Sequence, residues 1–349
     1  MACALLFNDT VVSASAPVER RSRDPSGVNP PVTVQPISLP TFVAEPRHAF
    51  RDIDGVRLHW VEYGDADARA PVVLLHGLND SYLTWSRIAP LLSRGRRVLA
   101  LDLPGHGLSD RPDASYELAW YASIVARWID SLDAPPIDLV GHSLGGGIAL
   151  ALLAECRPSV RRLVLAAPGG LGREVSFVLR LASIPGVVEH FGQPFMSIGT
   201  RLALSGWRQK LPDQHIAELC AMNATRGSAR AFARTVRDLI DWRGQRHSFF
   251  QHVHEVRDLP PIAILWGDGD TIIPIAHGRA LVEGIDGVRF VELVGCGHHL
   301  HHDDPLAFTQ GVRDAVDAVS WPTMRVRIVA QAKPRIAAWF GDPESVRTG

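Results

Sequence analysis

The chain has 349 residues, 46% of them hydrophobic and 21% charged, and a formal net charge of −1. This balance excludes a disordered or collagen-like chain and a protein that binds nucleic acid through bulk positive charge. The four cysteines show no CxxC spacing, which argues against a zinc knuckle or a disulfide framework, and no apolar run reaches the ~18 residues of a membrane helix. We therefore expect a cytoplasmic protein without a transmembrane span or a nucleic-acid partner.

Residues 1–46 contain seven prolines and no sustained hydrophobic periodicity, which predicts a disordered N-terminal tail. The short apolar patch near Met1 has no basic residues before it, so a secretory signal is not expected. The fold should begin with two alternating segments, Phe50 to Ile53 and Val56 to Tyr63, that flank Asp54-Gly55. This pattern predicts an antiparallel hairpin at one edge of a sheet.

Short, continuous apolar runs then alternate with helical stretches, as expected for strands that are buried on both faces. The runs cover residues 72–75, 98–101, 137–140, 163–166, 262–266 and 290–294, and the predicted helices cover 83–92, 118–132 and 144–153. This order predicts an α/β fold, with a mostly parallel sheet and helices on both faces. Functional residues should then gather at the carboxyl ends of the strands.

The alternation stops for about 90 residues after Pro168, which is too long for a simple crossover loop. Helical patterns over 174–181, 195–204, 213–222 and 228–241, without a convincing strand, predict an inserted helical cap at residues 169–256. Its apolar underside would comprise Phe177, Leu181, Phe191, Phe195, Met196 and Trp207. The alternative is that these side chains pack the core of the cap itself.

The run Gly141-His142-Ser143-Leu144-Gly145 stands between a predicted strand and a predicted helix. A G-x-S-x-G motif at such a junction forms a sharp turn that exposes a nucleophilic serine, here Ser143. The following helix directs its first amides toward the same place, so the N–H of Leu144 is a candidate oxyanion donor. The alternative is a glycine-rich turn without chemistry.

On these residues the sequence resembles the α/β-hydrolase family over roughly residues 50–320, with core segments at 47–168 and 257–320. His76-Gly77-Leu78-Asn79 is similar to the family's oxyanion loop, which implies that Leu78 supplies a second N–H donor and that His76 is structural. The segment from Asp102 to Asp110 is similar to a family turn that shapes this loop without taking part in chemistry.

The resemblance also implies the two partners that a serine nucleophile needs, a histidine base and a carboxylate that orients it. The family's W-G-x-x-D-x-x-x-P pattern matches residues 266–274 and places the acid at Asp270, with Asp268 as a local competitor. The last predicted strand leads to His298, which the resemblance makes the general base. The other histidines of this run, His299, His301 and His302, are expected in the pocket or on the surface, and a zinc or iron site is the alternative.

The expected activity is cleavage of carboxylic esters through an acyl-enzyme, with a small acyl substrate and without a metal or organic cofactor. Alternatives are a carbon–carbon bond hydrolase of ring-cleavage products, a cofactor-free haloperoxidase-like enzyme, an acyltransferase and a non-catalytic ligand-binding protein. Relatives that cleave carbon–carbon bonds tend to use a cap arginine; candidates are Arg180, Arg201, Arg208, Arg226, Arg230, Arg234, Arg237 and Arg243. Candidate pocket residues are Asn79, His142, Phe177, Leu181, Phe195 and His299.

Residues 321–349 extend beyond the helix with which the family usually ends. They carry five basic and two acidic side chains, together with several apolar ones. We interpret this extension as a surface tail, or alternatively as a weak contact with an anionic membrane surface or a second subunit.

Overall fold

The computed structural model describes residues 46–65, 69–134, 136–155, 160–184, 186–205, 212–253, 256 and 258–327. The predicted N-terminal tail therefore lies outside the described residues, apart from Pro46. Of the C-terminal extension, residues 321–327 are described. Trp207 and Arg208 also lie outside the described residues.

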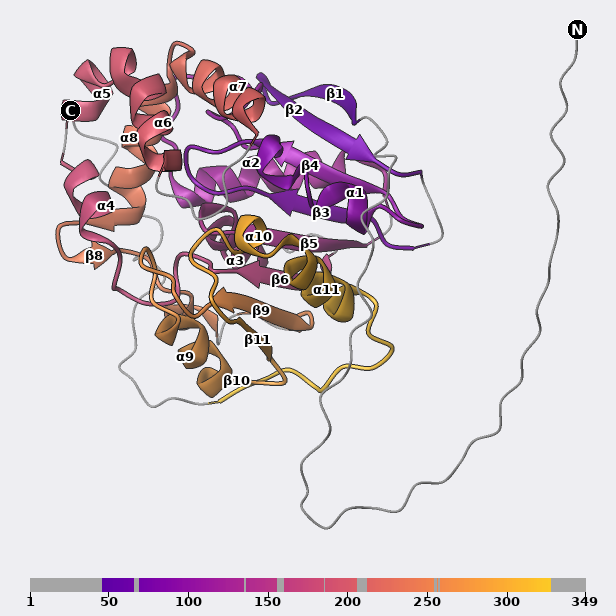
Figure 1. The fold of residues 1–349 in the computed structure, drawn as a ribbon. Helices are drawn as coiled ribbons and strands as arrows, with labels where there is room; N and C mark the ends of the chain where they lie inside the picture. Colours follow the sequence, from indigo (N-terminus) through magenta and orange to yellow (C-terminus); the bar gives the residue numbers. More distant parts are fainter. Residues whose placement is uncertain are drawn as a thin grey trace, which may run out of the picture. The chain divides into compact units, whose positions relative to one another are not determined.

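A central sheet of eight strands runs through the fold, in the order β1-β2-β4-β3-β5-β6-β9-β11 (Figure 1). Its strands are β1 (Arg47–Ile53), β2 (Val56–Tyr63), β3 (Val72–Leu75), β4 (Val98–Asp102), β5 (Ile137–His142), β6 (Val160–Ala166), β9 (Ile262–Gly267) and β11 (Arg289–Leu293). β1 and β2 pair antiparallel, as do β2 and β4, whereas the remaining pairs are parallel. The predicted edge hairpin and the parallel α/β sheet are thus confirmed.

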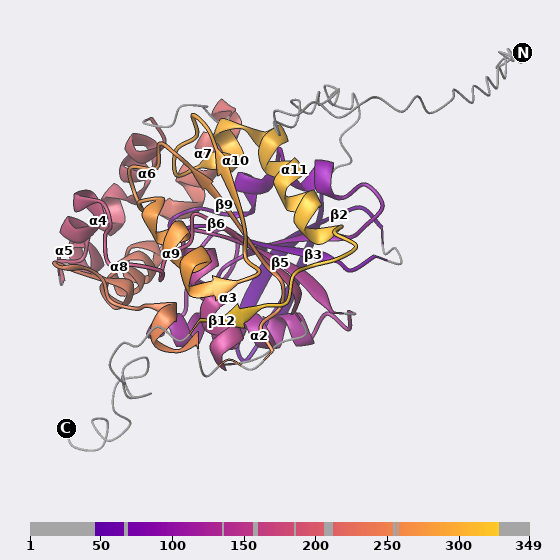
Figure 2. The same cartoon turned by 90° about the horizontal axis from the view of Figure 1, so that it is seen from below.

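The middle strands are buried along their whole length because helices cover both faces of the sheet. Every residue of β3, β4, β5 and β9 is buried. α1 (Ala89–Leu92) packs with α11 (Pro305–Val316) on one face, and α2 (Leu118–Asp130) packs with α3 (Leu144–Glu155) on the other. Figure 2 shows α11 on one side of the sheet and α2 and α3 on the other. This burial gives the rigid frame from which the loops at the carboxyl ends project.

A helical insertion separates β6 from β9. It contains α4 (Phe177–Ala182), α5 (Val187–Phe191), η2 (Gln193–Phe195), α6 (Met196–Ser205), α7 (Asp213–Ala224), α8 (Ser228–Leu239), the short strands β7 (Ile240–Asp241) and β8 (Gly244–Gln245), and η3 (Phe249–Gln251). The sequence analysis missed α5 and the β7–β8 pair, because a strand of two residues leaves no alternation to detect. The exact limits of the cap, 169–256, stay a prediction.

One predicted helix, residues 83–92, is wrong as a single element. The structure has a 3-10 helix, η1 (Tyr82–Trp85), followed by the separate α1. Ser81 caps η1 by accepting a hydrogen bond from Leu83 N–H at 3.3 Å. Pro90 lacks an N–H group and therefore belongs in the first turn of a helix, so it starts a new helix instead of continuing the old one.

The described part of the C-terminal extension returns to the core. β12 (Arg325–Val326) pairs antiparallel with β10 (Ile285–Asp286), and the Trp321 indole donates to the Gly287 carbonyl at 2.9 Å. α9 (Ala276–Gly284) precedes β10, and the short α10 (Leu300–Asp303) precedes α11. Among the described residues, none of the helices combines the length and the apolar character that crossing a bilayer requires.

Candidate active site

Ser143 occupies the sharp turn between β5 and α3. Its φ of 51° lies in the left-handed region, a strained conformation for a residue with a side chain, and its N–H donates to the Ala166 carbonyl at 3.0 Å. The turn closes only because its neighbours are glycines: a Cβ on Gly141 would lie 2.5 Å from the Gly145 carbonyl oxygen, and one on Gly145 would collide with the Leu75 carbonyl. The motif therefore forms the expected elbow and leaves Ser143 partly exposed.

Ser143, His298 and Asp270 lie in one hydrogen-bonded chain. The His298 Nε2 atom is 3.0 Å from Ser143 Oγ, and its Nδ1 atom is 2.8 Å from Asp270 Oδ2. The three residues follow the carboxyl ends of β5, β11 and β9, so the parallel sheet brings them to one edge. The Asp270 side chain has no exposed surface, and that of His298 is 7% exposed.

Backbone and indole donors hold the Asp270 carboxylate. Its Oδ1 accepts from the N–H groups of Ile272 and Ile273 at 2.8 and 3.0 Å, and its Oδ2 accepts from the Trp266 indole at 3.1 Å. Asp268 instead accepts from the Gly295 N–H at 2.6 Å. The structure therefore pairs His298 with Asp270, and Asp268 serves the neighbouring turn.

His142 lies behind this chain and is 1% exposed. Its Nε2–H donates to the His298 carbonyl at 2.9 Å, so the His142 side chain holds the His298 backbone in place. Burial, followed by the proximity of His298, holds the pKa of His142 well below its usual value. The ring is therefore a neutral donor at physiological pH.

The N–H groups of Leu78 and Leu144 are the two predicted oxyanion donors. Within the described residues, neither the Leu78 N–H nor the Leu144 N–H donates a hydrogen bond. The Gly145 N–H donates to the His76 carbonyl at 3.1 Å and so joins the loop of Leu78 to the start of α3. His76 is structural, as predicted: it is fully buried and accepts from the Leu103 N–H at 3.0 Å.

A buried polar cluster joins the Leu78 loop to the helical insertion; we call Asn79, Thr200 and Asn223 the Asn79 clasp. The Asn79 amide donates to the Thr200 hydroxyl at 3.0 Å, and the Asn223 amide donates to the Asn79 carbonyl at 2.9 Å and to Thr200 Oγ1 at 3.1 Å. Thr200 and Asn223 are 2% and 1% exposed. Asn79 was a predicted pocket residue, whereas Thr200 on α6 and Asn223 on α7 were missed.

Two histidines that were expected in the pocket or on the surface are buried instead. His301 and His302 are 0% and 1% exposed, and their Nε2 atoms lie 2.7 and 2.8 Å from the Thr84 hydroxyl. That hydroxyl can donate to one ring and accept from the other, so it satisfies both. Burial lowers the pKa of His302 to about 3. His299 lies beside them, with its ring centroid 5.4 Å from that of His142.

The described residues include no set of three or more His, Cys, Asp or Glu side chains arranged to hold a metal ion. The predicted pocket residues Phe177, Leu181 and Phe195 are 62%, 50% and 64% exposed. The interpretation that they form the core of the cap is therefore wrong. A role beside the substrate stays a prediction for them.

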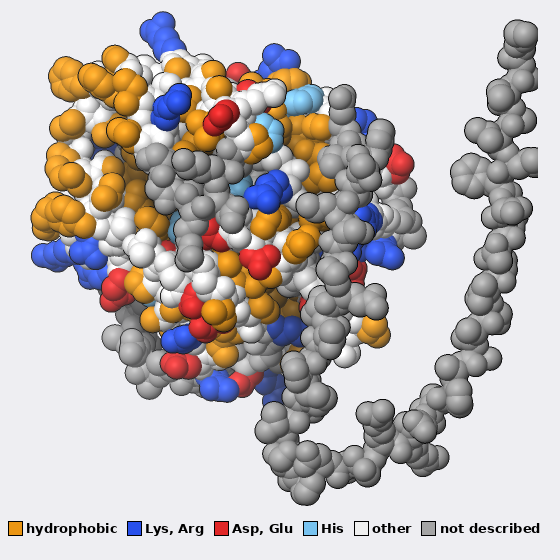
Figure 3. Space-filling model, viewed as in Figure 1, with side chains coloured by type: hydrophobic (Ala, Val, Ile, Leu, Met, Phe, Trp, Pro, Cys, Tyr) orange, Lys and Arg blue, Asp and Glu red, His pale blue; other side chains and the backbone are white. Residues whose placement is uncertain are grey.

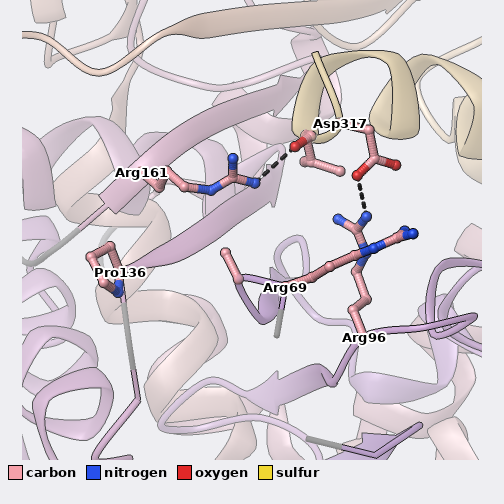
Figure 4. Close-up of a pocket in the computed structure, with 7 residues that line it drawn as sticks. Arg69, Arg96, Pro136, Arg161 and Asp317 are labelled. Atoms are coloured by element: carbon pink, nitrogen blue, oxygen red, sulfur yellow. Dashed lines mark hydrogen bonds and ion pairs between the residues drawn. The ribbon is translucent and has the colours of Figure 1, made fainter. Parts of the chain in front are cut away.

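A separate cavity of about 770 Å³ lies at the other end of the parallel strands, where they begin (Figure 4). Arg69, Arg96, Arg161 and Asp317 are among its lining residues. Arg96 forms an ion pair with Asp317, and Arg161 donates to the Val316 carbonyl at 2.8 Å. The guanidinium groups of Arg96 and Arg161 bind the C-terminal end of α11, and the lining residues of this cavity are distinct from those of the Ser143 site.

The fold and this site define an α/β hydrolase. The family described as alpha/beta hydrolase fold matches residues 70–305, and the chain belongs to it. It is 31% identical over 287 residues to an uncharacterized protein of Mycobacterium tuberculosis, covering 79% of this chain and 82% of that protein. It is also 29% identical over 268 residues to a 2-hydroxy-6-oxo-2,4-heptadienoate hydrolase of Pseudomonas putida, covering 73% and 91%.

Solved structures agree on the fold. The crystal structure of Cfl2 from Burkholderia cenocepacia matches with a TM-score of 0.67 and 25% identity, over 79% of this chain and 97% of that one. The fold class and the family that the sequence motifs predicted are therefore confirmed.

Proposed function

We propose that the protein is a serine hydrolase that cleaves carboxylic esters through an acyl-enzyme. Ser143 is the nucleophile, His298 the general base, and Asp270 the carboxylate that orients the imidazole. The observation that supports this proposal is the unbroken hydrogen-bonded chain from Ser143 Oγ through both ring nitrogens of His298 to Asp270 Oδ2.

In the proposed cycle, His298 Nε2 takes the hydroxyl proton as Ser143 Oγ attacks the acyl carbonyl. The N–H groups of Leu78 and Leu144 bind the oxyanion, and Asp270 stabilises the imidazolium. His298 then gives its proton to the departing alcohol. A water molecule, deprotonated by His298, attacks the acyl-enzyme, and the acid leaves as Ser143 regains its proton. The neutral His142 adds no second positive charge beside the imidazolium.

A carbon–carbon bond hydrolase is the second candidate, because a relative at 29% identity is named as a hydrolase of a heptadienoate. Such an activity would call for a cationic side chain to bind a substrate carboxylate. Three cap arginines are already engaged: Arg230 and Arg234 pair with Asp113, and Arg234 and Arg237 pair with Glu189. We therefore rank ester cleavage first among the proposals. The cytoplasmic location and the remaining pocket residues stay predictions.

The test is hydrolysis of p-nitrophenyl esters from acetyl to palmitoyl by the wild type and by Ser143→Ala. We expect Ser143→Ala to lose on the order of 10³-fold in kcat with an unchanged circular dichroism spectrum. Turnover of a heptadienoate-type substrate without any ester turnover would favour the second candidate. Wild-type ester rates in Ser143→Ala would refute the proposed nucleophile.

A matched pair of variants tests the acid. Asp270→Asn removes the carboxylate that stabilises the imidazolium, so we expect kcat to fall by at least about 10²-fold. Asp268→Asn keeps an oxygen for the Gly295 N–H, and its kcat should stay within about threefold of the wild type. The opposite ranking, measured by steady-state kinetics on one ester, would contradict the assignment of Asp270.

A further inference from the structure

Large apolar side chains face solvent on α4, α5, η2 and α6 and in the turn between β7 and β8. We call the following set the apolar cap surface: Phe177, Val178, Phe191, Phe195, Ile198 and Trp242. Each is between 59% and 73% exposed, and neither α4 nor α5 contains a buried residue. Figure 3 shows the hydrophobic side chains of this region gathered at the upper left, over the helices labelled α4, α5 and α6 in Figure 1.

The exposed apolar area of this set is comparable to the largest apolar patch of a typical monomer. A fully exposed aromatic side chain presents about 200 Å², so the four aromatics alone expose on the order of 500 Å². The largest apolar patch of a typical monomer covers about 300–600 Å² in total, and such patches are often functional. Val178 and Ile198 enlarge the area further. Two of the rings, Phe177 and Trp242, already touch, with centroids 5.7 Å apart.

Basic groups predominate around this surface, with Asp241 and Arg243 standing on either side of Trp242. Residues 175–205 contain a single acidic side chain, Glu189, and its carboxylate binds Arg234 at 2.7 Å and Arg237 at 3.1 Å. Arg180 on α4 and Arg201 on α6 are the basic residues of the same stretch. The Arg201 side chain is exposed to solvent. The apolar cap surface is therefore bordered by basic groups without a free acidic neighbour in this segment.

We propose that the apolar cap surface docks on a phospholipid bilayer that contains anionic lipids. Aromatic and aliphatic side chains on one side of a helix, with basic residues beside them, are the pattern of helices that lie in the plane of a membrane interface. The apolar groups enter the boundary between headgroups and acyl chains, and the arginines bind lipid phosphates. A symmetric dimer formed through this surface fits less well, because it would bring the basic side chains of the two copies close together.

The same helix connects this surface with the site. α6 presents Ile198 to solvent, whereas Thr200 and Leu204 point inward and are 2% and 5% exposed. Thr200 belongs to the Asn79 clasp, which holds the loop of Leu78. Docking through this surface would therefore place the membrane against the helix that contacts the predicted oxyanion loop. The docking itself does not depend on the proposed ester cleavage.

Sedimentation with vesicles tests the proposal on the full chain. The vesicles consist of phosphatidylcholine alone, or of phosphatidylcholine with about 30% phosphatidylglycerol. We expect the wild type to sediment with the anionic vesicles, and at least about fivefold less of it with the neutral ones. The double variant Val178→Asp/Phe191→Asp should lower the bound fraction at least about tenfold, because it adds two negative charges and removes apolar area.

The control is Val319→Asp, which introduces an aspartate at a fully exposed valine after the C-terminal end of α11. It should bind vesicles like the wild type. Both variants should keep the wild-type circular dichroism spectrum and the wild-type rate on a short, water-soluble ester. This last readout separates failure of docking from failure of the proposed enzyme activity.

Three results would overturn the proposal. The first is a wild type that stays in the supernatant with anionic vesicles. The second is a double variant that sediments like the wild type. The third is a wild type that light scattering shows to be a dimer, while the double variant is a monomer and neither binds vesicles, because the surface would then bind a second copy.

Discussion

Breaking the Asn79 clasp should lower the rate of catalysis as well as the stability of the fold. Asn223→Ala removes the donor to the Asn79 carbonyl and one of the donors to Thr200 Oγ1. The Asn79 carbonyl then loses its partner in a buried site, which costs about 1–3 kcal/mol in the free energy of unfolding. At about 2–4 °C per kcal/mol, the melting temperature should fall by roughly 2–12 °C.

The effect on catalysis follows from the position of Asn79, directly after Leu78. Loss of one oxyanion donor costs about 10²–10³-fold in kcat, so a displaced Leu78 loop should cost at least about tenfold, with little change in KM. Cys220→Ala is the control: Cys220 lies on the same helix, is 8% exposed and takes no part in the clasp. Its kcat on a p-nitrophenyl ester should stay within about twofold. A destabilised Asn223→Ala with the wild-type kcat would refute the coupling.

Two further predictions concern stability. Burial raises the pKa of Asp80 to about 7, well above the usual value of an aspartate, so the folded state holds a proton that the unfolded chain releases near pH 4. The free energy of unfolding should therefore fall by on the order of 4 kcal/mol as the pH rises from about 4 to 7. Urea titrations across this range should show the fall for the wild type and not for Asp80→Asn. Parallel pH profiles of the two proteins would contradict this prediction. Arg162 donates to the carbonyl of Ala315, in the last turn of α11, and to that of Ala318, beyond the helix. Arg162→Ala should therefore lower the unfolding free energy by about 1–2 kcal/mol in the same assay, and an unchanged midpoint would show that these bonds contribute nothing.

The parallel sheet could be predicted from sequence because each buried strand is a short apolar run with a helix on either side. The position of the candidate site followed from it, since the carboxyl ends of parallel strands meet at one edge. Ser143, Asp270 and His298 each come directly after such a run, which is why residues 28 to 155 positions apart in the chain could be grouped. The turn around Ser143 can also be recognised in the sequence, because only glycine fits at positions 141 and 145 beside its backbone.

The Asn79 clasp had no comparable signal. Thr200 and Asn223 lie 121 and 144 residues from Asn79, and each is a polar residue within a helix, where a solvent-facing position is the ordinary expectation. The burial of His301 and His302 was equally hidden, because it depends on one hydroxyl, that of Thr84, more than 200 residues away. Long-range polar pairing is decided by the assembled fold, and no local pattern reports it.

The contrast between the central strands and the helices α4 and α5 has a consequence for how this chain can change. Substitutions in β3 or β5 remove buried contacts, and each costs folding energy on the order of 1–5 kcal/mol. α4 and α5 contain no buried side chain, so most replacements there fall within about 0.5 kcal/mol. Mutational libraries confined to these two helices can therefore vary the outer face of the helical insertion while the scaffold keeps its stability margin.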